Sequence, residues 1–149
     1  MGTGRPKSVI VVGAGIVGAS AAYFLGRAGY HVRLLDAAGP AAGATGAADG
    51  AVSVASKRPG PMMAAALAGV ALYRALRDEG LLAGLYKTRP TLMVAEDDTE
   101  IPVLDRHAEA LAEAGVCIER LEGAALRRRI PVASRRVRAA IEVSGEGHA

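Results

Sequence analysis

Four residues near the N-terminus have types and spacing that suit a phosphorylated ligand: Gly13, Gly15, Gly18 and Asp36. In the pattern G-x-G-x-x-G, the first glycine permits a tight turn, the second lets the backbone approach a pyrophosphate, and the third lets a helix pack on a sheet. The new helix offers free N–H groups and the positive end of its dipole to phosphate oxygens. Asp36 is placed to accept hydrogen bonds from a ribose diol, and its charge would repel a 2′-phosphate. These residues predict a dinucleotide site that disfavours NADP.

A strand, a helix and a second strand must position these residues, and the sequence predicts all three. A short β-branched strand begins near Val9, an alanine-rich helix runs until Gly29, and residues 31–35 alternate as a second strand. Ala22 lies on the same helix face as Gly18, which allows close packing on the strands. We interpret the segment as a βαβ unit. The alternative is an ordinary glycine-containing βα unit without a ligand.

A loop of small residues, AAGPAAGATGAADGA, follows Asp36. One interpretation is a flexible linker. The other is a cofactor loop, because small side chains can lie against a nucleotide and Thr45 supplies a hydroxyl for a phosphate. The alternating segment Val52-Ser53-Val54 after the loop is a candidate strand.

The remainder of the chain predicts alternating helices and strands. Proline and glycine mark the ends of several elements, and a short polar lead-in, residues 1–7, precedes the first strand. The expected elements are a helix over 61–79, two short strands over 85–95 with a turn at Arg89-Pro90, a helix over 101–114 ended by Gly115, a strand over 116–119, a helix over 121–129, a strand over 138–143 and a terminal loop.

Four further features have a structural and a functional interpretation, and we prefer the structural one for each. The acids of residues 96–100 suit a helix start better than a metal site, since no His or Cys converges with them. Cys117, in an apolar run, is expected to be buried, and His107 to be a solvated helix residue. The arginines between 127 and 138 suit a helix C-terminus and a solvated loop better than nucleic acid or anionic lipid, because no aromatic residues are interleaved.

Composition narrows the class of protein. The chain has 149 residues, a net charge of +3, 3% aromatic residues and a single cysteine. Neither an intrachain disulfide nor a thiolate metal cluster can form. The uncharged residues 8–26 superficially resemble a signal peptide, but glycines at fixed offsets fit the βαβ unit better. We expect a cytoplasmic protein without nucleic-acid partners, and with peripheral membrane association at most.

Taken together, the segments carry a family likeness. The N-terminal unit, the loop GATGAADGAVSVASKRPGPMM and the segment YKTRPTLMVAED resemble FAD-dependent oxidoreductases of the D-amino acid oxidase and glycine oxidase superfamily. The nearest likeness is to D-amino acid dehydrogenase and hydroxyproline dehydrogenase-type subunits. The resemblance implies an α/β fold, with a Rossmann-like FAD-binding βαβ unit followed by the beginning of an α+β substrate domain. Residues 1–80 would belong to the FAD-binding domain and residues 81–149 to the substrate side, apparently truncated because family proteins are more than twice as long.

The resemblance also implies a cofactor site and a reaction. FAD would be bound by nine residues, and the activity would be oxidation of the C–N bond of an amino or imino acid by hydride transfer to the flavin. No catalytic residue and no metal ligand is identified, and a partner subunit or a C-terminal half would complete the enzyme. The alternatives are a non-catalytic dinucleotide-binding module or remnant that requires a partner, and an NAD-dependent dehydrogenase. The expected FAD-binding residues are Gly13, Ala14, Gly15, Ile16, Val17 and Gly18 at the pyrophosphate, Asp36 at the adenosine ribose, and Thr45 and Gly50 in the second cofactor loop.

Overall fold

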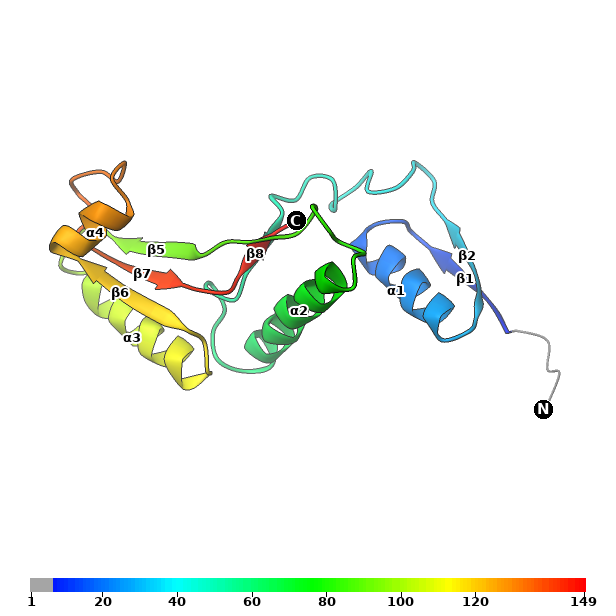
Figure 1. Ribbon diagram of the computed structural model, residues 1–149, viewed down its shortest axis with the longest axis horizontal. Coiled ribbons are helices and arrows are strands. Elements are labelled where there is room, and N and C mark those ends of the chain that lie inside the picture. The colour runs from blue at the N-terminus through cyan, green and yellow to red at the C-terminus, as the bar shows by residue number, and fades with distance from the viewer. Residues whose placement is uncertain (1–6) are drawn as a thin grey trace. The chain divides into compact units, whose positions relative to one another are not determined.

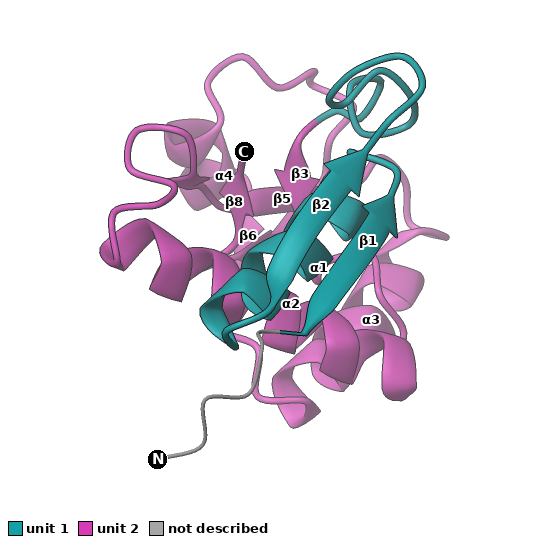
Figure 2. Ribbon diagram, turned by 90° about the vertical axis from the view of Figure 1, so that its right-hand side faces the viewer, with its two compact units in different colours: residues 1–49 teal, residues 50–149 magenta. Residues whose placement is uncertain are grey.

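The computed structural model describes residues 7–149, so the lead-in before Lys7 lies outside the described residues. The chain divides into two compact units, residues 1–49 and residues 50–149 (Figure 2). In the first unit, strand β1 (Ser8–Val12) pairs in parallel with β2 (His31–Leu35), and helix α1 (Ile16–Arg27) connects them (Figure 1). Parallel strands require a crossover of this kind. The βαβ prediction is therefore confirmed.

Local sequence explains both the packing and the end of α1. Gly18, Ala22 and Leu25 are partly buried on one face of the helix, and α1 contacts both strands. Gly29 has a φ of +86°, in the left-handed region that favours glycine. The N–H of Tyr30 donates to Leu25 O at 3.0 Å, and the N–H of Gly29 donates to a carbonyl in the last turn. This Schellman arrangement stops the helix where the sequence predicts.

The second unit contains an antiparallel sheet with the order β5-β7-β6. The strands are β5 (Thr91–Ala95), β6 (Ile118–Glu122) and β7 (Ala139–Val143). Side chains alternate across the central strand, so Ile141 packs in an apolar cluster with residues of α3 (Ile101–Glu113), and Ala140 packs in another with α4 (Gly123–Arg129). Because both faces are covered, all five residues of β7 are buried.

The second unit also contains α2 (Pro61–Asp78) and a small sheet with the order β3-β8-β4. Met63 and Val70 of α2 belong to the same apolar cluster as Ile141. The strands of the small sheet are β3 (Ala51–Val52), β4 (Lys87–Thr88) and β8 (Gly147–His148). The boundary between compact units thus follows Asp49, whereas the domain boundary expected after residue 80 stays a prediction.

α3 forms as its sequence predicts. Leu104, Ala108 and Leu111 are buried on one face, and Gly115 follows the helix with a φ of +81°.

Among the described residues, no helix is both long enough and apolar enough to cross a membrane.

The predicted pair of strands over 85–95 exists, but a hairpin turn between them is wrong. β4 pairs with β8 and β5 pairs with β7, so both strands run antiparallel to the same later segment, residues 139–148. Pro90 lacks an N–H and interrupts the ladder. Thr88 is opposite Gly147 and Thr91 is opposite Val143, which leaves one extra residue on the later segment. That mismatch is a β-bulge. Because it pairs with β3 and β4, the segment Gly147–His148 is a strand, where we expected a terminal loop.

The predicted strand over 116–119 and helix over 121–129 are both shifted. The N–H of Val116 donates to Leu111 O at 3.0 Å, so Val116 closes the end of α3 instead of starting a strand. Leu121 pairs with Ala140 in the sheet and packs beneath α4. The strand consequently runs to Glu122, and α4 begins only after it.

Two predictions about single side chains are wrong. Cys117 is exposed, because the strand begins after it and the buried residue of the run is Val116. His107 is partly buried instead of solvated, and its Nε2 lies 2.6 Å from Ala55 O. A residue on a helix flank can reach a distant loop in this way, and the spacing of apolar residues along the helix does not reveal it.

Candidate functional site

The exit from β1 is a tight turn that depends on two glycines. Gly13 has a φ of +101°, and its N–H donates to Leu35 O at 2.7 Å, at the end of β2. A Cβ atom at Gly18 would overlap the carbonyl oxygen of Gly13. The first turn of α1 can therefore lie directly against the strand exit only when residue 18 has no side chain.

The N-terminus of α1 is suited to an anion. Gly15 is the N-cap and has no side chain, and no acidic residue occupies the first turn. The side chains of Ile16 and Val17 are 51% and 81% exposed. The first N–H groups of a helix have no intrahelical acceptor, and the dipole is positive at this end. Backbone donors, not side chains, therefore make residues 13–18 a candidate phosphate site.

The Asp36 carboxylate is held by backbone donors. It accepts hydrogen bonds from the N–H groups of Ala14 at 2.7 Å, Ala38 at 2.8 Å and Gly39 at 2.9 Å. These bonds, with the one from Ala14 the largest contribution, lower the pKa of Asp36 below its usual value. The carboxylate thus stays ionised and braces the glycine turn. Sequence reasoning missed this bracing role, although an Asp followed by small residues and a glycine is typical of an Asx turn.

The loop after Asp36 packs on the glycine turn. Thr45 Oγ1 accepts a hydrogen bond from the N–H of Ile16 at 2.9 Å, and Ala41 donates its N–H to Ala14 O at 3.0 Å. A Cβ atom at Gly15 would lie 3.0 Å from Thr45 Oγ1. These attachments favour the cofactor-loop interpretation over a flexible linker. They also place the Thr45 hydroxyl at the end of the helix where a phosphate is expected.

Gly50 belongs to the second unit and is constrained there. Its φ is +78°, and its carbonyl accepts a hydrogen bond from the N–H of Ala149 at 2.9 Å. A Cβ atom at residue 50 would lie 2.8 Å from Cε1 of His148. The packing of the β8 segment is enough to require a glycine, so the expected contact of Gly50 with a cofactor stays a prediction.

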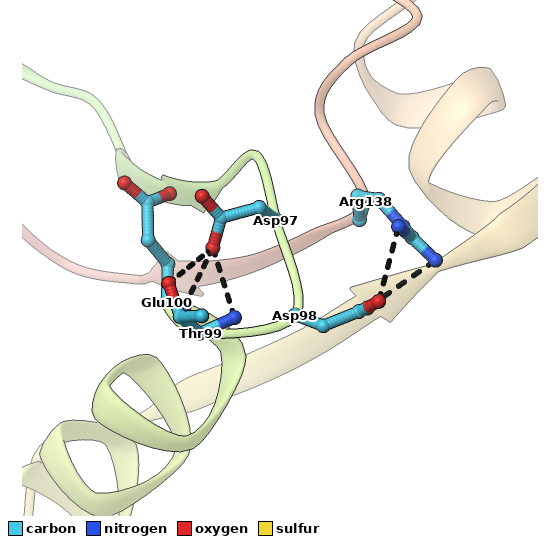
Figure 3. Close-up of polar contacts among 5 residues, drawn as sticks. All are labelled: Asp97, Asp98, Thr99, Glu100 and Arg138. Carbon is cyan, nitrogen blue, oxygen red and sulfur yellow. Dashed lines mark hydrogen bonds and ion pairs between the residues drawn. The ribbon is translucent and has the colours of Figure 1, made fainter.

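The acids of residues 96–100 start a helix, as predicted. Figure 3 shows Asp97 Oδ1 accepting hydrogen bonds from Thr99 and from the N–H of Glu100 at 3.0 Å. Asp98 pairs with Arg138, with Oδ1 and Nη2 3.2 Å apart. No group of His, Cys, Asp and Glu able to hold a metal ion occurs among the described residues. The acids thus form the turn that leads into α3, and Asp98 pairs with a neighbouring cation.

Most arginines between 127 and 138 have structural partners. Arg127 donates to Ser134 O at 2.9 Å, and Arg129 pairs with Glu142, with Nε and Oε2 2.5 Å apart. Arg136 pairs with Glu96 at 3.0 Å. Together with the Arg138 pair, these contacts support the structural interpretation of the cluster.

Comparison with known proteins gives one family and several similar folds. Residues 8–149 match the family described as DAO, FAD dependent oxidoreductase. No curated protein is a significant match to the sequence.

Several solved structures have a similar fold. Glycine oxidase from Geobacillus kaustophilus has a TM-score of 0.83 at 23% identity, over 95% of this chain and 40% of that one. L-proline dehydrogenase from P.horikoshii has a TM-score of 0.83 at 21% identity, over 97% and 38%. L-amino acid deaminase from Proteus vulgaris has a TM-score of 0.82 at 20% identity, over 97% and 35%. At these identities the likeness shows the fold, and the chain spans 35% to 40% of the length of these structures.

Proposed function

The chain belongs to the DAO family of FAD-dependent oxidoreductases. We propose that it binds FAD as part of an enzyme that oxidises the C–N bond of an amino or imino acid. The observation that carries the proposal is the family match, which extends over both compact units. The names of the similar structures support the substrate class, because glycine, proline and L-amino acids are the compounds in them.

The residues of the first unit fit FAD as a ligand. The pyrophosphate of FAD needs donors and a positive potential, which the N-terminus of α1 supplies. The N–H groups of Gly13, Ala14 and Ile16 donate within the unit, so the donors of residues 13–18 that are proposed to face the pyrophosphate are those of Gly15, Val17 and Gly18. The adenosine ribose needs an acceptor. An ionised carboxylate has about four lone-pair sites, and backbone donors occupy three at Asp36, which leaves one for a ribose hydroxyl. Thr45 contributes a hydroxyl beside the same helix end.

The nine expected cofactor residues have different roles in this proposal. Gly13, Gly15 and Gly18 shape the turn. Ala14 and Ile16 use their N–H groups to hold Asp36 and Thr45 in place, and Val17 acts through its backbone, because its side chain carries no polar atom. Gly50 is proposed to let the backbone of the second loop lie close to the flavin. None of these contributions transfers a proton, so this part of the enzyme binds and orients.

When bound, FAD supplies an acceptor for the hydride that leaves the substrate α-carbon. The substrate loses a proton from nitrogen at the same time, which leaves a C=N bond that water hydrolyses. Orientation is the main requirement for such a transfer, since holding two reactants in the productive geometry removes much of the entropic barrier. No described residue is assigned as a general base.

Anaerobic reduction tests this proposal. The FAD-loaded protein, completed by the partner subunit or C-terminal half that the family resemblance implies, is mixed without oxygen with glycine, proline and the D- and L-forms of other amino acids. The visible flavin absorbance is followed. We expect at least one of these compounds to bleach the flavin and to yield ammonia or a cyclic imine. A protein that binds FAD but is bleached by none of them is instead a non-catalytic module or acts on another substrate class. Bleaching by NADH alone would also overturn the proposal.

A further inference from the structure

Glu146 is a buried carboxylate with an unusual set of partners. Only 1% of the residue is exposed. Oε1 accepts hydrogen bonds from the N–H groups of Val54 at 2.5 Å and Ala55 at 2.6 Å, and Oε2 accepts one from the hydroxyl of Ser53 at 2.9 Å. The partners lie 91 to 93 positions earlier in the chain. One side chain thus holds three consecutive residues of a distant segment.

The bulge between β7 and β8 presents this carboxylate. Gly145 has a φ of +79°, and a Cβ atom there would overlap the Arg74 guanidinium. The backbone of Glu146 is fixed too, because its carbonyl accepts a hydrogen bond from the N–H of Arg89 at 2.9 Å. A bulge re-aims the side chains that follow it. The ladder therefore gives the Glu146 side chain a defined direction.

The segment that Glu146 holds has further attachments on either side. Ala51 and Val52 of β3 pair with β8, and Gly50 O accepts the N–H of Ala149. Ala55 is held through both backbone groups, since its carbonyl lies 2.6 Å from His107 Nε2. Residues 50–55 form a short stretch whose conformation is determined by side chains and strands from elsewhere in the second unit.

A carboxylate suits this position better than an amide. The three partners are all donors, and an ionised carboxylate offers only acceptors, whereas an amide would turn an NH₂ group toward one of them. Bonds to an ionised acceptor are also stronger than bonds between neutral groups. In the described part of the chain no ion pair joins Glu146 to a Lys or Arg, so these three donors are the polar partners of its carboxyl group.

We propose that Glu146 is a positioning residue for FAD: by holding Ser53, Val54 and Ala55, its carboxylate fixes the conformation in which the adjoining second cofactor loop, from Gly50 onward, meets the cofactor. The inference rests on the proposed function, since it assumes that FAD is the ligand of that loop. Glu146 itself acts through the segment that it holds, and it contributes no proton and no direct contact to the reaction.

The test compares two buried glutamates of residues 139–148 that have different partners. Glu146→Ala removes the acceptor of the 53–55 segment. Glu142→Ala is the matched control, because Glu142 is also buried but pairs with Arg129 on another part of the unit. For each protein, hydrogen exchange of residues 50–55 is measured without cofactor, FAD affinity is measured by flavin fluorescence, and the unfolding midpoint is recorded.

For Glu146→Ala we expect faster exchange over residues 50–55 and a Kd for FAD raised about tenfold, whereas Glu142→Ala keeps wild-type exchange there and wild-type affinity. Glu146→Gln, which retains one acceptor oxygen, should restore part of the affinity. If Glu146→Ala does not fold, Ser53→Ala removes a single bond, and a Kd raised about threefold is expected.

Three outcomes overturn the inference. Wild-type FAD affinity in Glu146→Ala would show that the hydrogen bonds from residues 53–55 to Glu146 do not affect FAD binding, and the proposed function would stand. An equal loss of affinity in both alanine variants, in step with their unfolding midpoints, would show a merely structural role. If the wild-type protein itself does not bind FAD, the proposed function and this inference fall together.

Discussion

A Cβ atom at Gly18 would overlap the carbonyl oxygen of Gly13, so no side chain fits between these two residues. This close approach joins the first turn of α1 to the exit of β1. It brings the N-terminal end of the helix to the point where a ligand meets the ends of the parallel strands. The cofactor proposal depends on this arrangement.

Gly18→Ala should destabilise the protein, because the added methyl group overlaps a backbone oxygen that cannot move without disturbing the turn. We expect a loss of at least about 2 kcal/mol in the free energy of unfolding. Gly26→Ala is the matched control in the same helix, where a Cβ atom meets nothing within 4 Å. That substitution should gain about 0.5 to 1 kcal/mol. Urea denaturation of both variants checks the prediction, and equal stabilities would contradict it.

Asp36 should contribute to the dependence of stability on pH. Backbone hydrogen bonds depress its folded pKa below the ordinary value of 3.8. Its contribution is therefore fully present above pH 3.8 and is lost as the pH falls through the lower, folded pKa. Urea denaturation across the acidic range should show a shallower decline for Asp36→Asn than for the wild-type protein. Parallel curves for the two proteins would show that the carboxylate is not held as described.

Thr45→Val should weaken the attachment of the loop to α1. Valine has nearly the shape of threonine but no acceptor, so the N–H of Ile16 loses its partner. We expect a loss of about 1 kcal/mol in the free energy of unfolding and faster hydrogen exchange in residues 37–49. Thr45→Ser keeps the hydroxyl and serves as the control. A valine variant that exchanges like wild type would indicate that the hydrogen bond is unimportant.

The thiol of Cys117 should react in the native protein, because the residue is exposed. A thiol reagent such as Ellman's should label the protein without denaturant, at a rate close to that in urea. Since this is the only cysteine in the chain, the reaction reports on a single site. Labelling that occurs only after unfolding would support burial instead.

Sequence reasoning succeeded where the signal was local. The glycines at 13, 18 and 29 each have a conformational or packing reason that acts within a few residues. The alternation along residues 31–35 likewise predicts a strand without knowledge of its partner. The βαβ unit was predictable for this reason, and so were the α3 face and its glycine stop.

Sequence reasoning failed where a residue's role depends on a distant partner. Glu146 bonds to residues more than 90 positions away, and nothing around it in the sequence marks it as buried. The pairing of β4 with β8 and of β5 with β7 is of the same kind, and a proline between two short strands resembled a turn. Cys117 and Val116 are adjacent and apolar, and only the end of α3 decides that Val116 is the buried one.

The central claim is that the glycine turn holds FAD, and an absorbance spectrum after adding FAD and desalting tests it most directly. Gly15 has an ordinary φ of −77°, so Gly15→Val does not require a left-handed backbone. The added side chain lies at the helix end beside Thr45 Oγ1, where the phosphate is expected. We predict that the wild-type protein retains the flavin bands and that Gly15→Val loses them while keeping wild-type circular dichroism. A wild-type protein that stays colourless, or a valine variant that retains as much flavin, would contradict the claim.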